Sequence, residues 1–355
     1  MAADDAASSP FFGFVHACWV SFRSSGAAPE PVTYSRSTDG GVTWDAPKQL
    51  TSASNQGLGS GRQGCQVDTD SDGVVYVFYR GGDAPKDNPP LFNRQMLMIR
   101  SFDGGVKWER PRPVADVVEC GLFDVAQGSR TFDGIAGART NSFPSVSIAN
   151  GAPLGNGPDT IVLSWCQGPT TTTGFGEQAL VQWSTDKGET WSGPVDAAPA
   201  SDRPDFPAIA ISPDGSDVYV TYMNFLQPWQ STTASERLMH GVVRHASVAG
   251  GVLGAFTDAH RGVNGDARGS STNGLTAEFL GDYNSVDAEN DFAYAVWNDV
   301  REAANCPTIS TWRQQRVEFL LGTGPNPGPP PSVATCPATF GNSDIWGTRV
   351  VDPTP

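Results

Sequence analysis

Lysine is scarce in this chain, and long apolar runs are missing. Of the 23 basic residues only four are lysine (Lys48, Lys86, Lys107 and Lys187), so arginine carries most of the positive charge, against 38 acidic residues and a net charge of −15. A surface of this sign repels phosphate backbones and anionic membranes, which argues against a nucleic-acid partner. No apolar stretch reaches the roughly 18 residues that a membrane span requires, so we expect none.

Metal-binding spacings are also missing. The six cysteines form no C-x-x-C pair, and the four histidines lie in separate elements or five residues apart. This pattern argues against zinc and thioredoxin-type sites, and we expect neither a metal nor a cofactor. Cys306 and Cys336 bracket a Pro-rich segment that a disulfide between them could close; the alternative is six free thiols.

The N-terminus lacks the basic and apolar regions of a secretory leader, and no N-x-S/T sequon occurs. We expect a secreted, extracellular and monomeric protein of bacterial origin, with its leader removed.

Glycine, proline and aromatic residues are abundant. The 355 residues include 40 Gly, 28 Pro, 10 Trp, 18 Phe and 7 Tyr, while charged residues make up 17%. This composition is typical of short strands joined by tight turns, so an all-β fold is predicted. We expect one domain over residues 1–355, with a Pro/Gly-rich insertion at about 322–335.

Three eight-residue segments repeat the pattern S-x-D-x-G-x-T-W, with Lys107 in the Thr position of the second. They are Ser37–Trp44, Ser101–Trp108 and Ser184–Trp191. The Asp carboxylate can accept backbone N–H groups across a turn, the Gly can adopt a positive φ, and the Trp ring can pack between neighbouring sheets. The motif resembles the Asp box of sialidases and related propellers. That resemblance implies a structural role for it, on the face away from the active site.

A second repeat is an apolar strand that ends in an aromatic residue. It occurs at Phe14–Trp19, Val74–Tyr79, Thr160–Trp165, Asp217–Tyr222 and Phe292–Trp297. Alternating segments such as Phe143–Ile148 and Phe206–Ile211 precede some of these strands and predict a further strand in each unit. We therefore predict a β-propeller of four-stranded antiparallel blades. Five blades are readable, with Ala249–Gly251 at the box position of the fourth; the sialidase-like resemblance implies six.

Strand direction alternates within a blade, so the boxes lie at one end of the propeller, and functional residues are expected at the other. There the chain offers Arg62, Arg139 and Arg203 before inner strands, and Arg80 and Arg301 after aromatic-ended strands. Sialidases hold the carboxylate of sialic acid with three arginines, and the resemblance implies that role for the first three. The alternative is that these arginines pair with acidic neighbours. The F/Y-R-I-P segment, which supplies the first arginine in sialidases, does not occur in this chain.

The resemblance also implies a tyrosine nucleophile. Tyr283 is the candidate, with Glu278 or Asp282 as its base, and Asp205 is a candidate acid from its position alone. The alternative for Tyr283 is packing in an inner strand.

A further acidic run, Asp68–Gly73, resembles the start of a Ca²⁺ loop, but Tyr79 stands where that loop needs a Glu, so we interpret it as a plain hairpin turn.

Two functions remain open from the sequence. One is a sialidase-like glycoside hydrolase acting on terminal, anionic sugars of glycans. The other is a non-catalytic propeller that binds glycans or proteins, since a fold does not specify a function.

Overall fold

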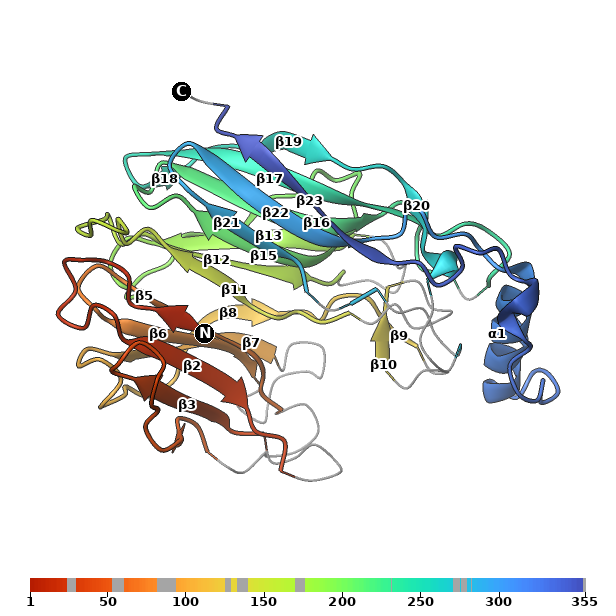
Figure 1. Cartoon of the computed structure of the whole chain (residues 1–355), viewed down its shortest axis with the longest axis horizontal. Coiled ribbons are helices and arrows are strands. Elements are labelled where there is room, and N and C mark those ends of the chain that lie inside the picture. Colours follow the sequence, from red (N-terminus) through yellow and green to blue (C-terminus); the bar gives the residue numbers. More distant parts are fainter. Residues whose placement is uncertain are drawn as a thin grey trace.

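The computed structural model describes residues 1–23, 30–52, 61–81, 94–124, 129–132, 140–169, 176–230, 232–270, 275, 280–281 and 283–353. These residues form five antiparallel sheets that follow one another along the chain (Figure 1). The first two sheets have four strands each: β1 (Ala2–Ala3), β2 (Val15–Val20), β3 (Val32–Ser37) and β4 (Lys48–Gln49), then β5 (Gln63–Thr69), β6 (Val75–Gly81), β7 (Arg94–Ser101) and β8 (Arg112–Val117).

A short hairpin, β9 (Leu122–Asp124) and β10 (Ser129–Thr131), precedes the third sheet. The third sheet contains β11 (Ser145–Ile148), β12 (Ile161–Gln167), β13 (Gln178–Ser184) and β14 (Val195–Asp196). The fourth contains β15 (Pro204–Ile211), β16 (Asp217–Phe225), β17 (Leu238–Ala249) and β18 (Val252–Leu253), with β19 (Thr257–Arg261) and β20 (Gly265–Asp266) also paired to β17. The fifth has three strands, β21 (Ser285–Ala288), β22 (Phe292–Asp299) and β23 (Asp344–Val351).

The sheets are arranged as propeller blades. The inner strands β5, β11, β15 and β21 contact one another in that order, and β2 of the first sheet contacts β5. Each pair of neighbouring sheets encloses its own hydrophobic cluster; examples are Tyr76 and Trp165 between the second and third, and Tyr219 and Trp297 between the fourth and fifth. The five aromatic-ended strands are each second in their sheet, as the repeats predict. Five blades are described, and a sixth stays a prediction.

The predicted turn mechanism of the Asp boxes is confirmed. In the first box Asp39 accepts hydrogen bonds from the Thr43 amide at 2.8 Å and the Thr43 hydroxyl at 2.6 Å, and Gly41 has φ +94°. The Trp rings of the second and third boxes pack on the preceding sheet. The ring centroids of Trp108 and Tyr34 are 4.6 Å apart, and those of Trp191 and Phe78 are 6.0 Å apart.

The boxes also tie each sheet to the next. Arg36 of the first sheet donates to the Gly104 carbonyl in the second box, and Arg100 of the second donates to the Lys187 carbonyl in the third at 2.6 Å. Lys187 in turn contacts Asp70 and Asp72 of the β5–β6 turn. The Asp68–Gly73 run is therefore a hairpin turn, as expected, and it shares an end of the propeller with the boxes.

All six cysteines are paired. The expected Cys306–Cys336 bridge is confirmed, with 5.0 Å between the Cα atoms. Two further bridges, which the sequence did not predict, join Cys18 of β2 to Cys65 of β5 and Cys120 to Cys166 of β12. The alternative of six free thiols is therefore wrong.

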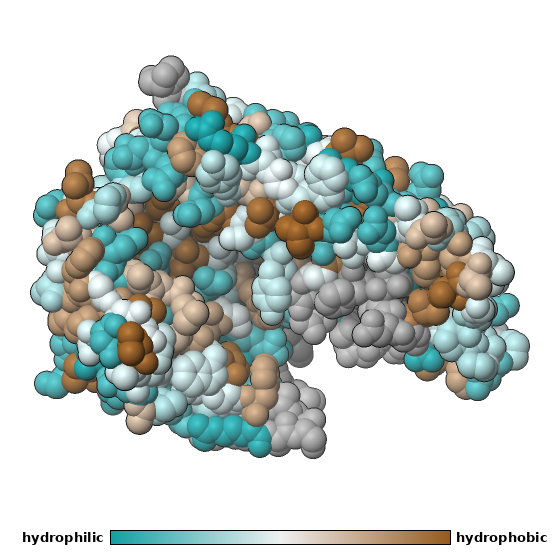
Figure 2. Space-filling model, in the orientation of Figure 1, coloured by the Kyte–Doolittle hydropathy of each residue, from teal (hydrophilic) through white to brown (hydrophobic). Residues whose placement is uncertain are grey.

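The fifth sheet carries an insertion between β22 and β23. It contains a helix that the sequence analysis missed, α1 (Pro307–Leu320), which projects at the right of Figure 1, and the Cys306–Cys336 bridge closes the insertion. Arg313 of α1 donates to the carbonyls of Arg268, Ser270 and Leu275. In the part of the chain that the structure describes, no helix has the length and apolar character of a membrane span. On the face shown in Figure 2, apolar residues form small separate patches.

Candidate functional site

A cavity of 370 Å³ lies at the end of the propeller opposite the boxes, where the inner strands begin. Four of the inner strands supply equivalent residues to its wall, and the end of β2 supplies the rest. The lining consists of Gln63–Gln66, Phe143–Ser145, Phe206–Ala208 and Tyr283–Asn284, together with Trp19, Val20 and Phe22. The cavity therefore lies on the propeller axis, where the sequence analysis expected function.

The wall combines aromatic rings with amides. Trp19, Phe22 and Tyr283 are 37%, 57% and 80% exposed, so their rings are available to a ligand. Gln63, Gln66 and Asn284 bring side-chain amides, which both donate and accept hydrogen bonds. Among the described lining residues no side chain carries a formal charge at neutral pH. Such a wall suits a hydroxyl-rich ring, whose apolar face packs on aromatic side chains while amides form hydrogen bonds with its edge.

The backbone at the cavity wall is held in unusual conformations. The β5–β6 pairing has a bulge between Gln63 and Gln66, where Gly64 has φ +68°. The β15–β16 pairing has its bulge at the equivalent place, and Phe206 there has φ +48°. A bulky residue in the left-handed region is a genuine outlier, and such outliers gather at functional sites. Asn284 supports this one by donating to the Phe206 carbonyl at 2.8 Å.

Of the predicted catalytic residues, the structure places Tyr283 in the cavity wall, exposed rather than packed inside an inner strand. Glu278 and Asp282, its candidate bases, lie outside the described residues. Asp205 precedes Phe206 of the wall but is only 1% exposed; it accepts hydrogen bonds from the Thr140 hydroxyl and the Phe206 amide. Burial raises the pKa of Asp205 well above the usual range of a carboxyl.

The predicted arginines that the structure describes, Arg62, Arg203 and Arg301, do not line the cavity. Arg203 is buried, and its guanidinium pairs with Glu177 and lies 4.5 Å from the centre of the Phe132 ring. Arg301 pairs with Asp299 at 2.7 Å and lies over the Trp346 ring. Arg62 is 3% exposed and donates to the Ser52 carbonyl at 3.2 Å. Arg139 lies outside the described residues, so the proposed triad is not assembled in the described chain.

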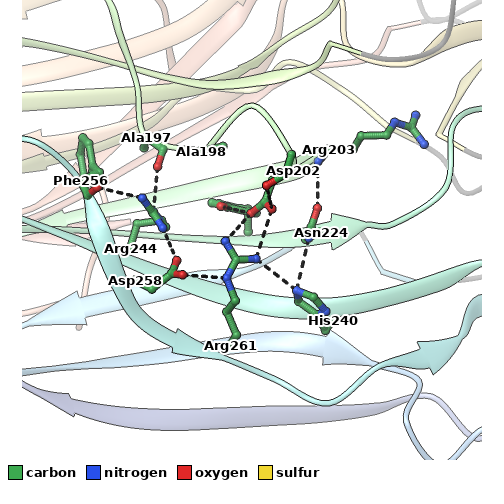
Figure 3. A network of polar contacts seen from close by, with 12 residues as sticks. Ala197, Ala198, Asp202, Arg203, Asn224, His240, Arg244, Phe256, Asp258 and Arg261 are labelled. Carbon is green, nitrogen blue, oxygen red and sulfur yellow. Dashed lines mark hydrogen bonds and ion pairs between the residues drawn. The ribbon is translucent and has the colours of Figure 1, made fainter.

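The segment that carries Arg203 is fixed by a polar network in the fourth sheet (Figure 3). Arg261 pairs with Asp202 at 2.9 Å and with Asp258 at 3.0 Å, and Asn224 accepts a hydrogen bond from the Arg203 amide. The Arg203 guanidinium points away from this network in the figure. The backbone of Arg203 is thus held from one side and its guanidinium from the other.

Another arginine group lies beside the cavity. Arg80 of β6 is the cross-strand partner of the lining residue Gln63, and it forms an ion pair with Glu119 at 2.9 Å, as Arg94 does at 3.2 Å. Arg130 donates to the Glu119 carbonyl. Burial, followed by repulsion from Arg80, lowers the pKa of Arg94. We call Arg80, Arg94 and Arg130 with Glu119 the Arg80 cluster; it carries more positive than negative charge.

The sequence analysis noted Arg80 after its strand but not Arg94 or Arg130. Arg94 begins β7, the third strand of its sheet, and Arg130 lies in the β9–β10 hairpin outside the blades, so neither stands directly before an inner strand or directly after an aromatic-ended one. No signal in the sequence links them to Glu119.

No family model and no curated protein matches this chain. Solved structures do. They include a GH93 alpha-L-arabinofuranosidase of Fusarium graminearum (16% identity, TM-score 0.48, 79% of this chain and 70% of that one), a Hadza microbial sialidase (12%, 0.40, 83% and 62%) and a polysaccharide lyase described as an ulvan lyase (11%, 0.41, 81% and 62%). The chain spans less than two thirds of the length of the last two. The order of its sheets and the contacts between their inner strands make this chain, in architecture, a β-propeller.

Proposed function

We propose that this chain acts on glycans and receives a terminal sugar in the axial cavity. The observation that carries the proposal is the wall itself, where the beginnings of four inner strands and the end of β2 bring aromatic rings and amides around 370 Å³. One sugar ring fits such a volume, and the mixture of ring faces and amides matches its two kinds of surface. The glycan-acting enzymes among the similar structures are consistent with this proposal.

The finer form of the proposal is a sialidase-like glycoside hydrolase. Tyr283 would attack the anomeric carbon while its phenolic proton passes to Glu278 or Asp282, and the bond to the leaving oxygen would break as Asp205 protonates it. Water would then release the sugar from the tyrosine. One feature supports this form: the Tyr283 side chain is 80% exposed in the cavity wall.

An anionic sugar is favoured by the Arg80 cluster. Arg80 of this cluster lies one strand outward from Gln63 of the wall, and the cluster has more guanidinium groups than carboxylates in an otherwise acidic protein. Guanidinium groups bind planar carboxylates in fixed geometry. We therefore place the carboxylate of a uronic or sialic acid on the Gln63 side of the cavity.

Glycan binding without turnover is the second candidate. One observation favours it: Tyr283 is the only titratable side chain among the described lining residues, since Cys65 is in a disulfide. Glycan binding requires the aromatic rings and amides of the cavity wall, but it does not require the acid and base that hydrolysis needs. The three disulfides suit an oxidising, extracellular compartment, where glycans are met.

The deciding experiment compares Tyr283→Phe with Tyr294→Phe. Tyr294 is also exposed, at 53%, but belongs to the middle of β22, away from the cavity wall. Fluorogenic sialosides, glucuronides and arabinofuranosides are the substrates. Hydrolysis by the wild type that Tyr283→Phe abolishes and Tyr294→Phe preserves establishes the hydrolase. Turnover that survives Tyr283→Phe removes that residue from the mechanism.

Binding is tested separately with Trp19→Ala and Trp44→Ala. The two rings are similarly exposed, 37% and 41%, but Trp44 belongs to the first Asp box. We expect Trp19→Ala to weaken glycan binding about tenfold, which corresponds to about 1.4 kcal/mol of ring contact, and Trp44→Ala to leave it unchanged. Equal effects of the two substitutions, or no glycan bound by the wild type, would refute the cavity as the site.

A further inference from the structure

A buried group of metal-ligating side chains lies between the fourth and fifth sheets, at the box end of the propeller. Asp217 begins β16, His245 belongs to β17, and Asp352 follows the last residue of β23. Asp217 and His245 are each 3% exposed at the side chain, and Asp352 is 14% exposed. Cations stabilise buried carboxylates, and a metal ion is one such cation.

The ligand atoms are spaced for a small cation. His245 Nε2 lies 2.7 Å from Asp217 Oδ1 and 4.0 Å from Asp352 Oδ1, and all three atoms lie within 4.8 Å of one another. Ligands bonded to a tetrahedral Zn²⁺ at 2.0–2.1 Å are about 3.3 Å apart. To reach that spacing, the distances from His245 Nε2 to Asp217 Oδ1 and to Asp352 Oδ1 would each change by less than about 1 Å, and rotation of a side chain can provide this change.

The Tyr219 hydroxyl provides independent evidence for an ion beside this group. It is fully buried, it faces His245 across the β16–β17 pair with 4.9 Å between ring centroids, and its hydroxyl has no hydrogen-bond partner. Tyr219 is two residues after Asp217 in β16, so the two side chains lie on the same face of the strand. A phenol held beside two carboxylates without a bond to either points to an atom between them, because buried hydroxyls are rarely left unsatisfied.

We propose that Asp217, His245 and Asp352 bind one divalent cation of borderline softness, Zn²⁺ in the first instance, with water or the Tyr219 hydroxyl as the fourth ligand. One imidazole and two carboxylates form a ligand set suited to zinc, and the two carboxylates balance the charge of the ion. The sequence analysis expected no metal because these ligands come from strands far apart in the chain and from two sheets.

The ion would join two sheets that no disulfide joins. Cys18–Cys65 links the first sheet to the second, Cys120–Cys166 reaches the third, and Cys306–Cys336 closes the insertion within the fifth. Asp352 holds the end of β23, so metal binding there would fix the last strand to the fourth sheet. Its role is structural and lies beyond the proposed glycan function, at the other end of the molecule.

The test uses untagged full-length protein treated with chelator, then titrated with Zn²⁺ by calorimetry and followed by thermal unfolding. We expect one ion per chain and a rise in Tm of about 5 °C at a zinc concentration 100 times Kd. Asp352→Asn should weaken binding at least about tenfold and remove the rise in Tm. The matched control is Asp344→Asn, an exposed carboxylate at the other end of the same strand, which should behave as the wild type.

Two results would overturn the site: no zinc bound by the wild type, or equal binding by Asp352→Asn and the wild type. If Asp352→Asn does not fold, the wild type loaded with Co²⁺ decides the question. Strong visible bands of a four-coordinate ion support the site, and their absence shows that His245 and Asp217 form only a hydrogen bond.

Discussion

Arg203 and Glu177 form a two-point ion pair in the interior, with Nε to Oε2 at 3.0 Å and Nη2 to Oε1 at 2.9 Å, and neither side chain is more than 1% exposed. Glu177→Gln should lower the free energy of unfolding by about 3–5 kcal/mol, because it leaves a buried guanidinium without its charge partner. Urea unfolding measures the loss. The double variant Glu177→Met, Arg203→Met should be less destabilised, since it removes both charges.

The same pair predicts how Arg203 affects activity. Because its guanidinium is committed to Glu177, we expect Arg203→Lys to change Tm and glycan binding together. A variant with unchanged Tm and lost binding would show instead that Arg203 contacts the ligand.

Asp68 of the inner strand β5 should make stability depend on pH. Burial raises the pKa of its carboxyl to about 7. Between its ordinary value near 4 and about 7, the folded state binds more protons than the unfolded state, so stability falls as pH rises through this window. Asp68→Asn removes that titration. The free energy of unfolding of the variant minus that of the wild type should therefore be larger at pH 8 than at pH 4, by up to about 4 kcal/mol. Unfolding curves at the two pH values measure it, and a constant difference would contradict the assignment.

Gly64 should be intolerant of a side chain. Its φ is +68°, and an added Cβ would lie 2.7 Å from the Phe143 ring of the cavity wall. Gly64→Ala should destabilise the fold by about 1–3 kcal/mol and weaken glycan binding by displacing that ring. Gly322→Ala is the control, because Gly322 has a similar φ of +72° and open space around it. It should show the backbone cost alone and keep full affinity.

Arg94 should set the preference for anionic ligands. Its side chain is 25% exposed in the Arg80 cluster, so replacement is tolerated better than at the buried Arg80. Arg94→Met should lower affinity for uronic or sialic acid ligands about tenfold and leave neutral sugars unaffected. The ratio of the two affinities, measured by calorimetry at low and high salt, is the readout. Equal losses for both ligand classes would place the cluster outside the recognition site.

The Cys18–Cys65 bridge should support both the fold and the cavity. It closes a separation of 47 residues, for which loop entropy gives about 4 kcal/mol, and Cys65 belongs to the cavity wall. Replacing both cysteines by serine should lower stability by about 2–4 kcal/mol and weaken glycan binding. An unchanged Tm would mean that the first two sheets hold together through their hydrophobic cluster alone.

Local patterns predicted the blades well because each pattern is contained in a few residues. The box sequence determines its own turn, and the aromatic-ended strands are apolar enough to be recognised alone. Helix α1 was missed because its residues, from Pro307 to Leu320, show no clear apolar stripe, and it is held by Arg313 and a disulfide. That support comes from elsewhere in the chain.

The site was predicted less completely. Strand direction predicted the end of the propeller at which the site lies, and Tyr283 was predicted from its position. A sequence does not show, however, which charged groups pair with one another. Two strands, β13 and β14, separate Glu177 from Arg203 along the chain, and β7 and β8 separate Arg94 from Glu119, so the pairing of these residues depends on sheet geometry. The roles of Glu278, Asp282 and Arg139 stay predictions.

The insertion of the fifth sheet has a consequence for ligand binding. Strand direction puts the β22–β23 connection at the mouth end, and there α1 is joined to the propeller through the Arg313 hydrogen bonds, while a covalent bridge closes the loop around it. Its backbone loses conformational entropy when the chain folds. The insertion contributes no residue to the described cavity wall, so a glycan long enough to extend from the cavity to the insertion would contact a segment that is already ordered.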